Sequence, residues 1–177
     1  LGFIKTTFPL LGLAGGSSVG ISSAMAAGLT RTTRVRSEET PESIGLDYRD
    51  VSFTSRGGDA RLSGWIITPE SGSDSPQTTA RGTSWVIMVH GDNTNRSDAK
   101  TGMLGIARAL NRRGFGILMF DLRGRGDSPA AMSSSGYFER LDLQGASDYL
   151  VSKGADRSRI GVLGFALGGA VALMAGS

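Results

Sequence analysis

The sequence predicts an α/β fold in which an N-terminal β-hairpin leads into a mostly parallel sheet flanked by helices. Two observations indicate this fold. Continuous apolar runs, "WVIMVHG" (residues 85–91) and "FGILMFD" (residues 115–121), suit strands that are buried on both faces of a parallel sheet. Segments with apolar residues at helical spacing alternate with these runs, and such alternation is typical of a sheet covered on both faces.

The hairpin is predicted over residues 48–68. Residues 48–55 alternate apolar and polar side chains like a half-buried strand, and residues 61–68 form a second strand. The Gly-rich turn "RGGDA" between the two segments joins them as a hairpin. A polar loop of Ser, Thr, Gly and Pro follows over residues 69–82.

One more strand and three helices complete the predicted order strand, helix, strand, helix, strand, helix after the hairpin. The last strand is "RIGVLG", residues 159–164. The helices are predicted over residues 97–113, over residues 137–153 and from Ala166 onward. In the first of them, four apolar residues share one face: Met103, Leu104, Ala107 and Leu110.

The N-terminal segment differs in composition from the rest of the chain. Residues 6–30 carry no charge and are long enough to span a bilayer, which takes about 20 apolar residues. Ala24-Met25-Ala26 resembles a signal-peptidase site. A membrane anchor, a cleaved signal peptide and a flexible leader are therefore alternatives for residues 1–30, and the protein is expected to be membrane-associated or exported. Residues 31–44 are expected to form a polar linker, and residues 45–177 the folded domain.

Composition excludes several function classes. The 19 Lys and Arg residues are scattered along a chain of net charge +3 and form no basic stripe, so no nucleic-acid partner is expected. With no Cys and one His, neither a thiolate nor a histidine-built metal site is expected. The glycines near residue 164 match neither a dinucleotide-binding fingerprint nor a P-loop. No metal or cofactor is therefore predicted.

A strand that turns sharply into a helix is predicted at "GFALGG", residues 164–169. A glycine on either side of a central residue is the pattern of a turn that displays a nucleophile. The central residue here is Ala166, which has no hydroxyl or thiol. The bland alternative is a turn of small residues that lets a helix and a strand pack closely.

Four motifs in series resemble the α/β-hydrolase superfamily, in its serine esterase and peptidase-like branch, over about residues 45–177. They are the opening hairpin, "VIMVHGDNTNRSD" with its HG loop, "FDLRGRGDS", and "RIGVLGFALGGAVAL". The resemblance implies hydrolysis of a carboxylic ester, amide or peptide bond through an acyl-enzyme, with a small-molecule ester or peptide-like substrate. The fold that it implies is the N-terminal half of that hydrolase fold.

The resemblance also implies roles for individual residues. It places Ala166 at the nucleophile position and the oxyanion-hole donors at the backbone amides of Asp92 and Leu167. The residues expected to support the elbow and its loops are Gly164, Gly168, His90, Gly91 and Asp121. His90 is expected to be structural, with a relocated general base as the alternative.

Three arginine and aspartate predictions accompany this assignment. Asp121 and Arg123 are expected to hold their loop together, with a catalytic role as the alternative. Arg125 departs from the family pattern and is expected to be solvated. Asp142 and Asp148 are expected on an exposed helix face or as local caps.

Ala166 leaves three explanations open. The first is that the nucleophile was replaced deliberately. The second is that the chain is an incomplete or degraded hydrolase, and the third is that it is a non-catalytic relative that acts as a binding module. The family's acid and histidine belong to strands beyond those in this sequence, which favours the second explanation. A five-stranded sheet would also leave its fifth strand as an exposed edge, which favours aggregation unless the edge is covered.

Overall fold

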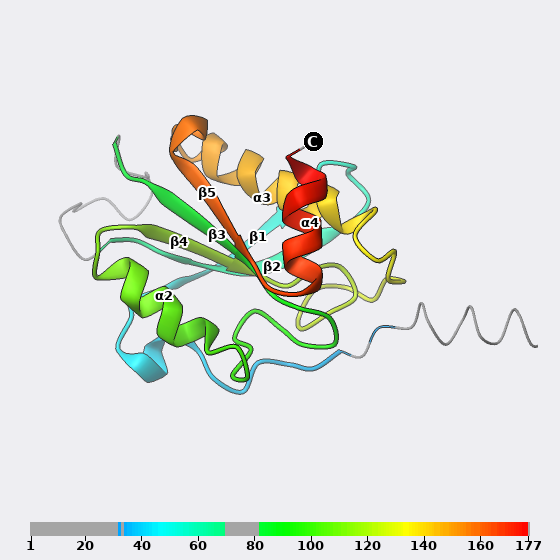
Figure 1. Cartoon of the computed structure of the whole chain (residues 1–177), viewed down its shortest axis with the longest axis horizontal. Coiled ribbons are helices and arrows are strands. Elements are labelled where there is room, and N and C mark those ends of the chain that lie inside the picture. Colours follow the sequence, from blue (N-terminus) through cyan, green and yellow to red (C-terminus); the bar gives the residue numbers. More distant parts are fainter. Residues whose placement is uncertain (1–31, 33, 70–81, 177) are drawn as a thin grey trace, which may run out of the picture. The chain divides into compact units, whose positions relative to one another are not determined.

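A five-stranded mixed sheet with helices on both faces makes up the described part of the computed structural model, which covers residues 32, 34–69 and 82–176 (Figure 1). The strands are β1 (Arg49–Thr54), β2 (Arg61–Ile67), β3 (Trp85–Val89), β4 (Gly116–Phe120) and β5 (Ile160–Gly164). The helices are α2 (Met103–Asn111), α3 (Glu139–Ser152) and α4 (Leu167–Ala175), with 3-10 helices η1 (Pro41–Ile44) and η2 (Arg157–Arg159). The predicted hairpin and strand–helix alternation are confirmed.

The strand order is β1-β2-β4-β3-β5, so the chain crosses over twice after the hairpin. β1 and β2 are antiparallel, and β2 pairs antiparallel with β4. β3 lies between β4 and β5 and is parallel to both. The carboxyl ends of β3, β4 and β5 therefore meet at one edge, where open α/β sheets place their functional loops.

Each face of the sheet packs against its own set of helices (Figure 1). α3 and α4 cover one face, where Leu143 and Val171 pack against alternate residues of β3 and β4 such as Ile87 and Leu118. α2 and η1 cover the other face, where Met103 packs with the intervening residues such as Met88. Because side chains alternate across a strand, the continuous apolar runs supply both cores at once.

Helix α2 begins at Met103, six residues later than the predicted start. The preceding residues form turns that are held by side-chain oxygens. The Asn95 Oδ1 accepts from the backbone N–H of Ser97, and the Asp98 carboxylate accepts from Lys100 and Thr101. Short polar side chains compete with the helical backbone in this way, which explains why helical spacing alone placed the start too early.

The predicted linker contacts the folded domain along much of its described length. The Thr32 Oγ1 donates to the Ala131 carbonyl at 3.0 Å, and the Asn95 Nδ2 donates to the Val35 carbonyl at 3.1 Å. Pro41 is buried at the start of η1. Thr32 and Val35 therefore lie against loops that follow β4 and β3, although the polar composition of this segment resembles that of a linker.

The fifth strand is an edge of the sheet, as expected, because β5 pairs with β3 alone among the described strands. Val162 on this strand is 44% exposed. None of the helices in the described ranges is long and apolar enough to cross a membrane. Residues 6–30 lie outside the described residues, so their membrane-anchor and signal-peptide assignments stay predictions.

Candidate active site

A sharp turn between β5 and α4 carries Ala166 at the carboxyl edge of the sheet. Ala166 has φ 48° and ψ −112°, a conformation that side-chain-bearing residues rarely adopt. A residue held in such a conformation stores roughly 1–3 kcal/mol of strain. Its exposed side chain is a methyl group, so the strained turn presents no nucleophilic atom at its centre.

Two glycines make this turn sterically possible. A Cβ on Gly164 would lie 2.3 Å from the Gly168 carbonyl oxygen. A Cβ on Gly168 would lie 2.2 Å from the Val89 carbonyl oxygen. Both contacts involve backbone atoms that have no room to move, so the close approach of α4 to β3 and β5 requires glycine at both positions.

The HG loop after β3 lies directly beside the turn. A Cβ on Gly91 would be 3.6 Å from the Ala166 Cβ, which is an ordinary van der Waals distance. The HG loop and the Ala166 turn are therefore neighbours. Within the described ranges, no acceptor is found for the backbone N–H of Asp92 or of Leu167. The loop and the first turn of α4 therefore leave two N–H groups, one from each segment, without a protein acceptor.

His90 is completely buried and both of its ring nitrogens are engaged. The Nε2 accepts a hydrogen bond from the Leu122 backbone N–H at 3.1 Å, and the Nδ1 lies 2.7 Å from the Gly91 carbonyl, to which it donates. Burial lowers the pKa of His90 from 6.5 to about 4. The imidazole is therefore neutral near pH 7 and joins the loops after β3 and β4.

Asp121 holds the HG loop to the loop after β4. Its Oδ1 accepts from the Arg96 backbone N–H at 2.7 Å, and its Oδ2 accepts from the Arg96 Nη1 and the Asp127 N–H at 2.9 Å each. Burial raises the pKa of Asp121, and the adjacent Arg96 guanidinium opposes that rise. Arg96 also lies 4.1 Å above the Trp65 ring. Sequence reasoning missed Arg96, because nothing in the HG loop's local pattern distinguishes it from a solvated arginine.

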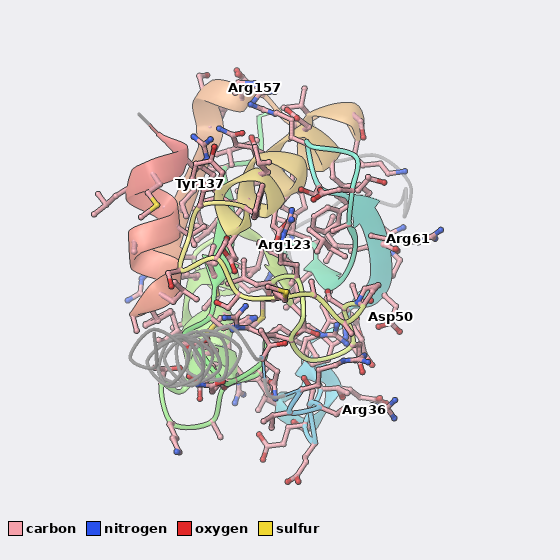
Figure 2. All side chains as sticks on the ribbon, turned by 90° about the vertical axis from the view of Figure 1, so that its right-hand side faces the viewer. Arg36, Asp50, Arg61, Arg123, Tyr137 and Arg157 are labelled. Carbon is pink, nitrogen blue, oxygen red and sulfur yellow. The ribbon has the colours of Figure 1, made fainter. Side chains whose placement is uncertain are left out.

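The prediction for Asp142 is wrong, because this residue is fully buried. The Asp142 Oδ1 lies 2.7 Å from the Arg123 Nη2, and its Oδ2 accepts from the Arg123 backbone N–H at 3.0 Å. Burial alone would lower the pKa of Arg123, but hydrogen bonds with Asp142 and Asp59 outweigh it and raise that pKa. Arg123 is 5% exposed and lies near the middle of the view in Figure 2, whereas Arg61 extends outward at its side.

The prediction for Arg125 is also wrong, because its side chain has no exposed surface. Its Nε and Nη2 donate to the Asp92 Oδ1, and its Nη1 donates to the Arg123 carbonyl at 3.1 Å. The Nη2 also donates to the Ser133 Oγ at 3.0 Å, and the Nη1 lies 3.7 Å from the Glu139 carboxylate. Asp92 lies 33 residues away from Arg125 in the sequence, which is why a local pattern did not reveal the burial.

No group of three or more His, Asp and Glu side chains among the described residues is arranged to hold a metal ion. The acidic residues at the carboxyl edge are instead paired with arginines, as in the Arg96–Asp121 and Arg123–Asp142 pairs. Asp121 and Asp142 therefore accept hydrogen bonds from arginine side chains.

Comparison with known families identifies this arrangement. A family model described as alpha/beta hydrolase fold matches residues 84–177, which is just over half of the chain. The chain belongs to this family. The match spans the HG loop, the loop after β4 and the Ala166 turn, so the resemblance noted in the sequence is confirmed.

Relatives of this α/β-hydrolase chain include an uncharacterized protein of Mycobacterium tuberculosis. It is 32% identical over 126 residues, which are 71% of this chain and 40% of the relative. A multifunctional-autoprocessing repeats-in-toxin of Vibrio vulnificus is 30% identical over 120 residues, which are 67% of this chain and 2% of that protein. The chain therefore spans less than half the length of these relatives.

Solved structures of esterases share the fold. The structure of an esterase from Pyrococcus furiosus has a TM-score of 0.69 and 30% identity, and the match covers 81% of this chain and 51% of the esterase. The observed mixed sheet with flanking helices therefore matches about half of a complete esterase fold. Relatives below 25% identity, such as a lidless serine hydrolase of Xanthomonas campestris, agree in fold.

Proposed function

We propose that this chain is the half of a serine-hydrolase scaffold that carries the nucleophile turn, and that the scaffold acts on carboxylic esters, amides or peptides. With Ala at position 166, the chain performs no acyl-enzyme chemistry in this proposal. The observation that carries the proposal is Ala166 in the strained conformation of a nucleophile turn, beside two amides that have no acceptor among the described residues. A strained residue in a sharp turn between a strand and a helix is where this kind of hydrolase places its nucleophile. The methyl side chain of Ala166 contains no atom that could attack a carbonyl. The substrate of an intact form would be a small-molecule ester or peptide-like compound.

The two unpaired amides, of Asp92 and Leu167, provide the electrostatic part of such a site. Acyl transfer places negative charge on the carbonyl oxygen, and two backbone N–H groups aimed at that oxygen stabilise it. Both donors belong to the main chain, so they are independent of the side chain at position 166. In this proposal the chain keeps an oxyanion hole and lacks the nucleophile that would use it.

The general base is also lacking among the residues of this sequence. A serine hydroxyl becomes nucleophilic when an adjacent base takes its proton. His90 is the single histidine, its Nε2 already accepts from Leu122, and its Nδ1 donates to Gly91. It has no free lone pair with which to accept a proton from position 166. We therefore expect Ala166→Ser to remain without esterase turnover.

A thiol tests the proposal more sharply, because it reacts with activated esters without a strong base. We expect the full chain with Ala166→Cys to release about one equivalent of nitrophenol from p-nitrophenyl butyrate and then stop. The matched control is Ser158→Cys, at an exposed site in η2. Ser158 precedes the amino end of β5, whereas Ala166 follows its carboxyl end. Acylation should be at least tenfold slower at the control thiol, since it lacks two convergent amide donors.

Three outcomes contradict the proposal. They are esterase turnover by the unchanged chain, turnover by Ala166→Ser, and equal acylation of the two thiols in folded protein. Turnover by the unchanged chain would mean that another residue supplies the nucleophile, and turnover by Ala166→Ser would mean that another residue acts as the base. The third would mean that the amides of Asp92 and Leu167 do not form an oxyanion hole.

A non-catalytic binding module is the second candidate, and it requires a ligand or partner at the edge of β5 that no other described strand covers. A pocket of about 240 Å³ lies beside this strand and is lined by Val162 and Ile160 of β5 and by Ala172 of α4. Arg56 and Arg157 also line this pocket. A binding module should stay monomeric and soluble as the full chain in sedimentation experiments. Concentration-dependent aggregation would count against this second candidate.

A further inference from the structure

Arg125 is a buried cation whose main partner, Asp92, belongs to the HG loop. The guanidinium donates two hydrogen bonds to the Asp92 Oδ1, from Nε at 3.2 Å and from Nη2. The Arg125 side chain is fully buried, whereas the Asp92 side chain is 52% exposed. The pair therefore joins a buried positive charge to a carboxylate that faces the open side of the loop.

The position of that carboxylate creates an electrostatic problem for the proposed oxyanion hole. The backbone N–H of Asp92 is one of the two donors, and a Cβ on the adjacent Gly91 would be 3.6 Å from the Ala166 Cβ. A carboxylate on the residue that donates to an oxyanion repels the charge that develops there. An unpaired Asp92 would therefore weaken the donor that its own backbone provides.

Arg125 both compensates the charge of the Asp92 carboxylate and holds that side chain in place. Two hydrogen bonds to one carboxylate oxygen hold the Asp92 side chain toward Arg125 and compensate its charge. The other Arg125 donors contact the Arg123 carbonyl and the Ser133 Oγ, so the guanidinium is itself fixed in one orientation. A fixed cation at this place restrains the loop that carries the Asp92 amide.

We propose that Arg125 is a positioning residue for the oxyanion hole, which neutralises Asp92 and fixes the HG loop so that the Asp92 amide faces position 166. This inference rests on the proposed function. It assigns a role to a residue that sequence reasoning placed in solvent. Arg125 acts through Asp92 and is not itself in contact with substrate.

The test measures the electrostatic field at position 166 without requiring turnover. The full chain with Ala166→Cys provides a thiol at this position, and the pH midpoint of its alkylation by iodoacetamide reports the field there. We compare this midpoint in three further backgrounds: Arg125→Gln, Arg125→Gln with Asp92→Asn, and Arg113→Gln. Arg113 is an exposed arginine just after the last turn of α2, so its variant makes the same change in net charge far from the elbow.

We expect Arg125→Gln to raise the midpoint by about half a pH unit, because the variant leaves the Asp92 carboxylate uncompensated near a partly solvated site. Adding Asp92→Asn should return the midpoint to the reference value, because the uncompensated carboxylate is then removed as well. Arg113→Gln should leave the midpoint unchanged. A purely structural Arg125 would not produce this rise and its reversal.

If Arg125→Gln does not fold, the single variant Asp92→Asn still tests the inference. Asn keeps an oxygen that accepts from Arg125, and the change removes a negative charge at an exposed position. This variant should lower the midpoint by about half a pH unit. An unchanged midpoint in folded Asp92→Asn, or in folded Arg125→Gln, would overturn the inference.

The two proposals fail in different ways. If nitrophenol release from Ala166→Cys matches the Ser158→Cys control, the proposed function fails, whatever the alkylation midpoints are. If that release occurs but the alkylation midpoint is the same in the Arg125 and Asp92 variants, the proposed function is retained and the role of Arg125 is refuted.

Discussion

The Leu122 backbone N–H donates a hydrogen bond to the Nε2 of His90 at 3.1 Å, and through it the loops after β3 and β4 share one buried imidazole. The other nitrogen of that ring donates to the Gly91 carbonyl, inside the HG loop itself. One neutral histidine thus holds the turn that leads to Asp92. The interaction requires the uncharged ring, because a protonated Nε2 has no lone pair for the Leu122 N–H.

The stability of the protein should consequently fall between pH 6.5 and pH 4. The folded-state pKa of His90 is about 4, below its ordinary value of 6.5, so the unfolded chain binds more protons across this window. The free energy of unfolding is then highest above pH 6.5 and decreases by about 3 kcal/mol as the pH falls to 4.

Urea unfolding of the full chain at several pH values measures this dependence. His90→Gln, which retains an acceptor and a donor, serves as the comparison because it does not titrate. The decrease between pH 6.5 and 4 should be much smaller in that variant. Equal decreases in the two proteins would show that His90 is not the group responsible.

A methyl group at Gly168 should unfold or severely destabilise the protein. The Gly168→Ala Cβ would lie 2.2 Å from the Val89 carbonyl oxygen, and neither backbone can move without separating α4 from β3. We expect a loss of about 3 kcal/mol or more, as for severe overpacking against backbone. Gly169→Ala is the matched control, since its Cβ would be 3.4 Å from the Gly164 oxygen. Thermal unfolding should separate the two variants, and similar melting temperatures would refute the steric argument.

Relief of strain at position 166 should stabilise the chain. Glycine adopts positive φ without a steric penalty, so Ala166→Gly removes roughly 1–3 kcal/mol of strain. The greater flexibility of unfolded glycine offsets about 0.5–1 kcal/mol of that gain. We expect a net increase of about 1 kcal/mol in the free energy of unfolding.

Ala170→Gly in the first turns of α4 provides the opposite expectation. Ala170 has an ordinary helical conformation, and glycine there should destabilise by about 1 kcal/mol. Denaturant unfolding of both variants gives the comparison. Destabilisation by Ala166→Gly of the same size as by Ala170→Gly would mean that position 166 is not strained.

The buried and exposed ion pairs of α3 should differ in their contribution to stability. Asp142 is buried against Arg123, whereas the Asp148 side chain is 41% exposed and pairs with Arg56 and Arg157 at 2.7 Å each. Asp142→Asn leaves a buried guanidinium without its full partner and should destabilise by about 3–5 kcal/mol. Asp148→Asn should change stability by less than about 1 kcal/mol. Chemical unfolding measures both effects, and equal effects would contradict the burial of the Arg123–Asp142 pair.

Local sequence patterns sufficed for the presence and order of the strands and helices and for the sharp turn at Ala166. The apolar runs at β3 and β4 identify strands because burial on both faces leaves no polar positions. The spacing of Gly164, Ala166 and Gly168 indicates the turn, because a crowded turn between a strand and a helix has to have small residues there. Each of these conclusions depends on residues within about ten positions of one another.

The tertiary structure alone decided the surroundings of the charged residues. Arg125 and Asp142 look like surface residues by their neighbours in sequence, but each meets its partner across a separation of at least 19 residues. The late start of α2 at Met103 and the contacts of Thr32 depend likewise on which loops lie together. A side chain's periodic position determines which face it occupies. Whether that face is open to water depends on segments brought there by the sheet, which is why these residues could not be assigned from the sequence.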